Sequence, residues 1–151
     1  MAGCSSLTSI DLSAFRDMTT VRPAFLTRCQ SLNTIDLSPL CNVTEVEYAF
    51  MLSCSALAAI DLSPFSNVTA IGSNFLGHCT SLTSIDLSPL VNLTTTLDKS
   101  FMLRCKALKP AMRKKFLQSV EDRKNNAGAP PPTTPVDARK KEVKVGGKKK
   151  K

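Results

Sequence analysis

The chain has 151 residues with a formal net charge of +8, 42% of them apolar, and it contains six cysteines, one histidine and no tryptophan. This composition suffices for one folded domain, and no stretch reaches the roughly 18 consecutive apolar residues of a membrane span. The N-terminal segment MAGCSSLTSI has neither the basic nor the apolar region of a signal peptide, so we expect a cytoplasmic or nuclear protein.

The charge is unevenly distributed along the chain. Residues 1–98 contain three basic and eight acidic residues, whereas residues 99–151 contain seventeen basic and four acidic residues. The first region is therefore expected to be acidic, and the basic character belongs to the C-terminal region.

A unit of about 25 residues is repeated from Cys4 onward, as in CSALAAIDLSPFSNVTAIGSNF over residues 54–75. The cysteines that open the units are Cys4, Cys29, Cys54, Cys79 and Cys105, and the phenylalanines that close them are Phe25, Phe50, Phe75 and Phe101. A fixed period of this length is typical of repeat proteins, whose units stack on one another. Stacking is required because one unit alone buries too little apolar surface to offset its loss of backbone entropy.

Each unit is predicted to form one coil. The pattern L-x-x-I-x-L alternates apolar and polar residues, which predicts a strand with one wet face, and the proline of DLSPL ends that strand in a turn. The segments NVTEVEY (residues 42–48) and NVTAIGS (residues 67–73) predict a shorter extended segment on the other side of the coil. The segment NFLGHC (residues 74–79) is interpreted as a helical turn that leads to the next cysteine.

Two irregularities lead to further expectations. The first unit has no capping segment before Cys4, so Leu7, Ile10 and Leu12 are expected to lack a covering neighbour and to favour self-association. The segment TTTLDK (residues 94–99) holds one residue more than its counterpart in the preceding unit, and it is predicted to bulge.

The repeat ends near residue 109, and a helix is predicted over residues 110–124. Pro110 suits the first position of a helix, and an apolar stripe follows at a spacing of four residues. The stripe consists of Met112, Phe116 and Val120, and the basic residues predicted to lie off it are Arg113, Lys114 and Lys115. We therefore expect a repeat domain of about four and a half units (1–109), a capping helix (110–124) and a disordered lysine-rich tail (125–151).

The pattern C-x-x-L-x-x-I-x-L-S-P-L-x-N-V-T, with its distal F-L-x-x-C, resembles the BspA-like (treponemal-type) leucine-rich repeat family over residues 4–108. The resemblance implies a right-handed leucine-rich repeat solenoid of β-rich coils with a binding role and no chemistry. Because the family is known from bacterial surface antigens, it also makes the cell surface an alternative location, and a fragment of a surface-antigen-like array an alternative role.

The cysteines do not predict a metal site or a cofactor. Zinc ligands are usually two to four residues apart, whereas these cysteines are about 25 apart, and His78 directly adjoins Cys79. We expect the periodic cysteines to be small buried hydrophobic residues and Cys41, outside the pattern, to be an exposed thiol; disulfides between coils are the weaker alternative. No catalytic motif or glycine-rich phosphate loop is present, so we predict that the protein is not an enzyme.

The polar face of the predicted strands is the candidate binding site. Its residues are Asp11, Asp36, Asp61 and Asp86, together with Ser9, Thr34 and Ser84. Stacked carboxylates repel one another, so they require hydrogen bonds or a cationic partner. Two interpretations remain open: the aspartates stabilise turns, or they form an acidic recognition stripe of a protein-protein interaction scaffold.

The basic tail predicts a second kind of partner. Its cationic residues are Arg139, Lys140, Lys141, Lys144, Lys148, Lys149, Lys150 and Lys151. They would bind nucleic acid or an acidic protein without sequence readout, because no aromatic side chain lies among them. A nucleic-acid- or ribonucleoprotein-associated protein is therefore the alternative function. The recurring N-x-T sequences at Asn42, Asn67 and Asn92 are interpreted as turn residues or as glycosylation sites of an exported form.

Overall fold

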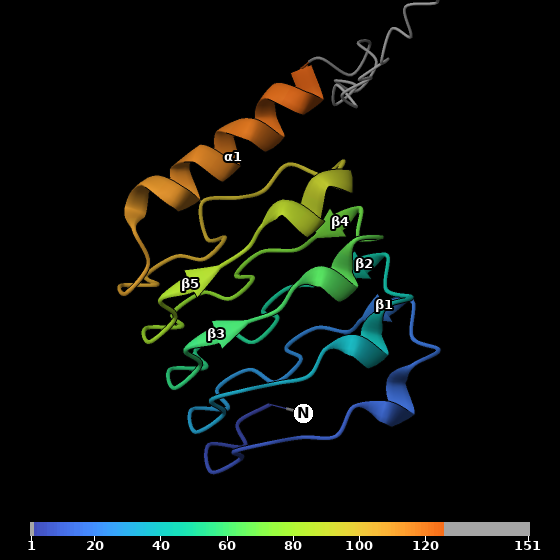
Figure 1. Cartoon of the computed structure of the whole chain (residues 1–151), viewed down its shortest axis with the longest axis vertical. Helices are drawn as coiled ribbons and strands as arrows, with labels where there is room; N and C mark the ends of the chain where they lie inside the picture. The colour runs from blue at the N-terminus through green and yellow to red at the C-terminus, as the bar shows by residue number, and fades with distance from the viewer. Residues whose placement is uncertain (1, 126–151) are drawn as a thin grey trace, which may run out of the picture.

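The computed structural model describes residues 2–125, which form a stack of coils with a helix at one end (Figure 1). The helix, α1 (Pro110–Asn125), lies across the last coil, and the N-terminal coil lies at the opposite end of the stack. Short 3-10 helices begin at the serine of the D-L-S sequence of each unit: η1 (Ser13–Phe15), η2 (Ser38–Leu40), η3 (Ser63–Phe65) and η4 (Ser88–Asn92).

Two small parallel sheets join the coils. Strands β1 (Thr20–Val21), β2 (Glu45–Val46) and β4 (Ala70–Ile71) form one sheet, and strands β3 (Ala59–Ile60) and β5 (Ser84–Ile85) form the other. Every strand pairs with the residues 25 positions away in the neighbouring coil, for example Val21 with Val46. The sequence period is therefore also the period of the stack.

The L-x-x-I-x-L strands are shorter than the sequence predicts. They are strands only at β3 and β5, over two residues each, and the three-stranded sheet comes from the N-V-T side of the coil instead. The strands are short because a hydrogen-bonded turn lies directly before and directly after each of them. In the third unit, Leu57 N–H bonds to the Cys54 carbonyl before the strand, and Phe65 N–H bonds to the Leu62 carbonyl after it.

The predicted helical turn at residues 74–79 is wrong. Asn74, Leu76 and His78 have φ values of 59°, 49° and 59°. The three corresponding residues in each of the two preceding coils are also left-handed, as are Met102 and Arg104 in the last coil. Such alternation directs backbone groups away from their own coil, so that Leu76 N–H reaches the Phe50 carbonyl of the preceding coil at 2.9 Å. Hydrogen bonds between coils accompany tight turns within the coil, such as Gly77 N–H to the Asn74 carbonyl at 3.2 Å, and a series of left-handed turns takes the place of the helical turn.

A column of stacked phenylalanines forms the centre of the core. The ring centroids of Phe25, Phe50, Phe75 and Phe101 are 5.9, 5.2 and 5.6 Å apart in succession. The expectation that the first coil is uncovered is wrong for Leu12, which is only 1% exposed within this core; Leu7 and Ile10 are partly buried. The neighbouring coil is therefore enough to bury Leu12.

Helix α1 carries the predicted apolar stripe. Phe116 and Val120 are buried, Met112 is partly buried, and the Phe116 ring stacks on Phe101 at 5.7 Å. The expectation that Arg113 lies off the packed face is wrong, because its guanidinium donates to the backbone carbonyls of Lys99 and Phe101.

The extra residue of the last coil alters its pairing. Residues 93–99 form no strand. Two backbone donors of the preceding coil bond to side chains of the last coil instead of to its carbonyls. Ile71 N–H reaches Thr95 Oγ1 at 3.3 Å, and Asn74 N–H reaches Ser100 Oγ at 2.7 Å. The ladder is thus interrupted where the sequence predicts a bulge.

Candidate interaction surface

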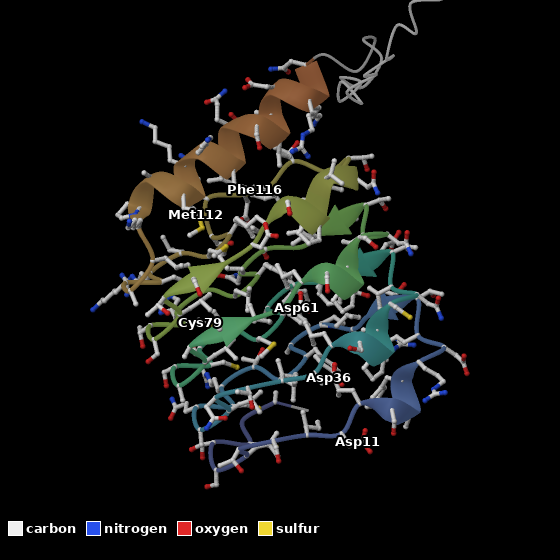
Figure 2. The ribbon with its side chains drawn as sticks, in the orientation of Figure 1. Asp11, Asp36, Asp61, Cys79, Met112 and Phe116 are labelled. Atoms are coloured by element: carbon white, nitrogen blue, oxygen red, sulfur yellow. The ribbon has the colours of Figure 1, made fainter. Side chains whose placement is uncertain are left out.

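The four aspartates of the repeat form an exposed row along the stack. Figure 2 shows Asp11, Asp36 and Asp61 one above another, each where the strand side of its coil meets the 3-10 turn. Asp86 holds the same position in the next coil and is also exposed. We call these four residues the acidic row.

A local turn fixes each carboxylate of the acidic row. The Oδ1 atoms of Asp11, Asp36, Asp61 and Asp86 accept the backbone N–H of Ser13, Ser38, Ser63 and Ser88 at 2.8, 2.8, 2.8 and 2.9 Å. The Ser63 and Ser88 hydroxyls also donate to the Oδ2 atoms of their aspartates, at 2.9 and 2.8 Å. An aspartate that bonds to the backbone two residues ahead stabilises a turn. These bonds support the turn-stabilising interpretation, while recognition by the acidic row stays a prediction.

These hydrogen bonds lower the pKa of three carboxyls of the acidic row. Bonds from the backbone and then the hydroxyl of Ser13 lower the pKa of Asp11, although the charge of Asp36 raises it slightly. The hydroxyl and backbone of Ser38 lower the pKa of Asp36, and the backbone and hydroxyl of Ser88 lower that of Asp86. These three carboxyls are therefore anionic at neutral pH.

The predicted polar partners of the aspartates are exposed as well. Ser9, Thr34 and Ser84 each precede an aspartate of the acidic row by two residues. Residues two apart on extended backbone face the same side, so these hydroxyls and the carboxylates share one face of the molecule. Ala59 takes this position in the third unit, which makes the hydroxyl row discontinuous.

The acidic row ends at a groove beneath α1. The groove has a volume of 400 Å³ and is lined by residues that include Asp86, Met112, Lys115, Phe116 and Arg123. Figure 2 shows Met112 and Phe116 on the side of α1 that faces the coils. Anionic and cationic side chains therefore lie together at this end of the acidic row.

Sequence reasoning did not foresee the function of the N-x-T residues. The side chains of Asn42, Asn67 and Asn92 donate to the carbonyls of Arg16, Cys41 and Ser66 at 2.9, 3.3 and 2.8 Å. The hydroxyls of Thr44, Thr69 and Thr94 donate to the carbonyls of Thr19, Thr44 and Thr69 at 3.3, 3.3 and 3.1 Å. Both residue types therefore tie one coil to the preceding one, and this explains why the sequence recurs. The signal that could have indicated this role is the recurrence of N-x-T every 25 residues, which is also the period of the stack.

The cysteines form a buried column of hydrogen-bond donors. The thiols of Cys54, Cys79 and Cys105 donate to carbonyls of the preceding coil at 3.2, 3.3 and 3.0 Å. Burial raises the pKa of Cys54 to about 12 and that of Cys79 further still. The prediction of buried periodic cysteines is confirmed from Cys29 onward, and Cys41 is exposed as predicted.

The described part of the chain offers neither a metal-binding cluster nor a membrane-spanning helix. Within residues 2–125, no group of three or more His, Cys, Asp or Glu side chains is placed to hold a metal ion. Of the helices in that same range, none has the length and apolar character needed to cross a membrane. The predicted anion-binding residues, from Arg139 to Lys151, lie outside the described residues.

Repeated parallel pairing at a fixed interval defines a protein built of stacked repeats. Residues 1–123 match a family model described as a BspA type leucine-rich repeat region (6 copies), and the chain belongs to this family. The family resemblance predicted from the sequence is thus confirmed, and the match extends beyond residue 109 into α1. No curated protein and no solved structure was found to match the chain.

Proposed function

We propose that this protein is a non-enzymatic scaffold, built as a right-handed solenoid, that binds another protein through the acidic row. The main support is the uniform fixing of four exposed carboxylates by backbone N–H groups at 2.8–2.9 Å. A partner with a row of lysine or arginine side chains has the complementary charge, and charged groups form the stronger hydrogen bonds.

The geometry favours an extended partner. Neighbouring parallel strands lie about 4.8 Å apart, so the acidic row presents a carboxylate at each such step along the stack. Because the turns already hold these side chains, binding costs little further side-chain entropy. Exposed charges are screened by salt, so such a partner would bind quickly and in a salt-sensitive way.

A pair of matched double variants tests this proposal. In the first, Asp36→Asn and Asp61→Asn remove two charges while an amide oxygen remains to accept the serine N–H. In the second, Glu45→Gln and Glu47→Gln remove two charges from exposed residues of the other sheet region. Binding of a synthetic polylysine peptide is measured by fluorescence anisotropy at low and physiological salt. We expect the aspartate variant to bind several-fold more weakly than the glutamate variant; equal weakening would show that only net charge matters.

A second candidate partner is a nucleic acid. Arg104, Lys106, Lys109 and Arg113 line one pocket at the start of α1, and the sequence from residue 99 onward is rich in basic residues. Such a cluster favours phosphate groups, and the affinity would fall steeply with salt. Replacing polylysine by a single-stranded RNA in the same assay distinguishes the two functions. Tight RNA binding that is unaffected by the aspartate changes would support the nucleic-acid function.

A further inference from the structure

The carbonyl of the phenylalanine in each coil is an acceptor that the next coil fills. Phe25, Phe50 and Phe75 accept the backbone N–H of Met51, Leu76 and Met102 at 2.8, 2.9 and 2.8 Å. These three bonds form one column through the stack. In the last coil, the corresponding acceptor is the carbonyl of Phe101.

The asparagine column described above fills a second set of acceptors. Each asparagine side chain donates to the carbonyl of the residue that precedes the corresponding position in the coil before it, as Asn92 does to Ser66 at 2.8 Å. The acceptor that continues this column in the last coil is the carbonyl of Val91.

Helix α1 supplies donors to both of these acceptors. Arg113 Nε donates to the Phe101 carbonyl, and Arg123 Nη1 donates to the Val91 carbonyl at 3.0 Å. Phe116 continues the phenylalanine column at 5.7 Å from Phe101, which is within the 5.2–5.9 Å found between the coils. Three kinds of contact that a further coil would make are therefore made by three side chains of one helix.

We propose that α1 is a surrogate for a further repeat: Arg113 and Arg123 take the donor positions of the next coil and close this edge against a second copy of the chain. An edge with unpaired carbonyls is a template for pairing with other backbone. A second copy is the partner that fits, because its first coil has the repeat spacing of this chain and carries Phe25 at the position of the phenylalanine column. The basic side chains of α1 thus prevent stacking between molecules as well as attach the helix.

Asp17 of the first coil interrupts the asparagine column. Asp17 lies 25 positions before Asn42, where the other coils have an asparagine. A carboxylate at this position cannot donate to the Val91 carbonyl of another copy, whereas an asparagine can. Changing Asp17→Asn therefore completes the donor column without altering α1.

The test uses full-length variants. Arg113→Ala with Arg123→Ala removes both donors together with the side-chain stems that attach α1 to the last coil, so that the helix no longer holds the edge closed. Lys109→Ala with Lys114→Ala removes the same charge from exposed residues near and on α1 and serves as the control. Sedimentation velocity over a range of concentrations measures association, and far-UV circular dichroism measures folding. We expect the mass of the arginine variant to rise above that of the monomer as concentration increases, without stopping at a dimer because the contact is head-to-tail, and Asp17→Asn to shift this rise to lower concentration.

Sedimentation of the arginine variant relative to the control supports or overturns the proposal. Association that depends on concentration in the arginine variant, but not in the control, supports closure of the edge by α1. A folded arginine variant that sediments like the control over the whole concentration range overturns it, even if its melting temperature falls. Should the double variant not fold, the single variant Arg113→Ala is compared with Lys114→Ala and interpreted in the same way.

Discussion

Gly72 lies at a close approach between two coils, so Gly72→Ala is a sharp test of the structure. A Cβ at this position would lie 2.7 Å from Tyr48 N, 2.9 Å from Glu47 C and 3.0 Å from Tyr48 Cα, all backbone atoms that cannot rotate away. The two coils would have to move apart to make room for this Cβ, and this would also weaken the 2.7 Å hydrogen bond from Gly72 N–H to the Val46 carbonyl. Overpacking costs about 1–3 kcal/mol and a lost backbone bond about 1 kcal/mol, so we expect about 2–4 kcal/mol of destabilisation.

Urea unfolding provides the measurement. Far-UV circular dichroism follows the whole fold, and the fluorescence of Tyr48, the only tyrosine in a chain without tryptophan, follows the contact itself. Ser73→Ala, in the adjacent and partly buried position, is the control and should change the free energy of unfolding by less than about 0.5 kcal/mol. A Gly72→Ala protein as stable as this control would refute the close approach of the two coils.

Three further predictions concern the left-handed segments and the thiols. Ser53 has a φ of 63°, so Ser53→Gly should raise the free energy of unfolding by about 0.5–1 kcal/mol in the same urea assay; a loss of stability would contradict the left-handed conformation. A bulky maleimide, with labelling followed by mass spectrometry, should modify the exposed Cys4 and Cys41 within minutes and the buried cysteines only on unfolding. Rapid labelling of Cys54 would contradict the buried column. Burial raises the pKa of Cys54 from an ordinary 9.0 to about 12, so between these pH values the folded state keeps a thiol proton that the unfolded state loses. The contribution of the protonated Cys54 thiol to stability is therefore complete below pH 9 and declines as the pH rises toward 12. In urea unfolding at stepped pH, Cys54→Ala should show a smaller decline over this range than the parent chain, and equal declines would refute the assignment.

The periodic features could be predicted because they depend on residue type at a fixed spacing. The phenylalanine column and the apolar stripe of α1 follow from apolar residues that recur where stacked units must bury them. The turn around each aspartate was also foreseeable as one of two interpretations, since aspartate two residues before an N–H is a local signal.

The left-handed segments could not be predicted in this way. Leu76 and Met102 have side chains that give no local preference for a positive φ, yet their φ values are both 49°. Their conformation results from hydrogen bonds between coils, such as Met102 N–H to the Phe75 carbonyl at 2.8 Å. Arg113 was misplaced for a similar reason, because a charge on a helix does not reveal which distant carbonyl it will meet.

The most direct test of the scaffold proposal uses four backbone amides. The N–H groups of Ser13, Ser38, Ser63 and Ser88 bond directly to the carboxylates of the acidic row. Their ¹⁵N-¹H signals therefore report any cation that binds there. On titration of the ¹⁵N-labelled full-length protein with polylysine peptide, we predict that these four signals shift together with one affinity and return as salt is raised. If they stay in place while signals near Glu45 and Glu47 move, the acidic row is not the binding surface.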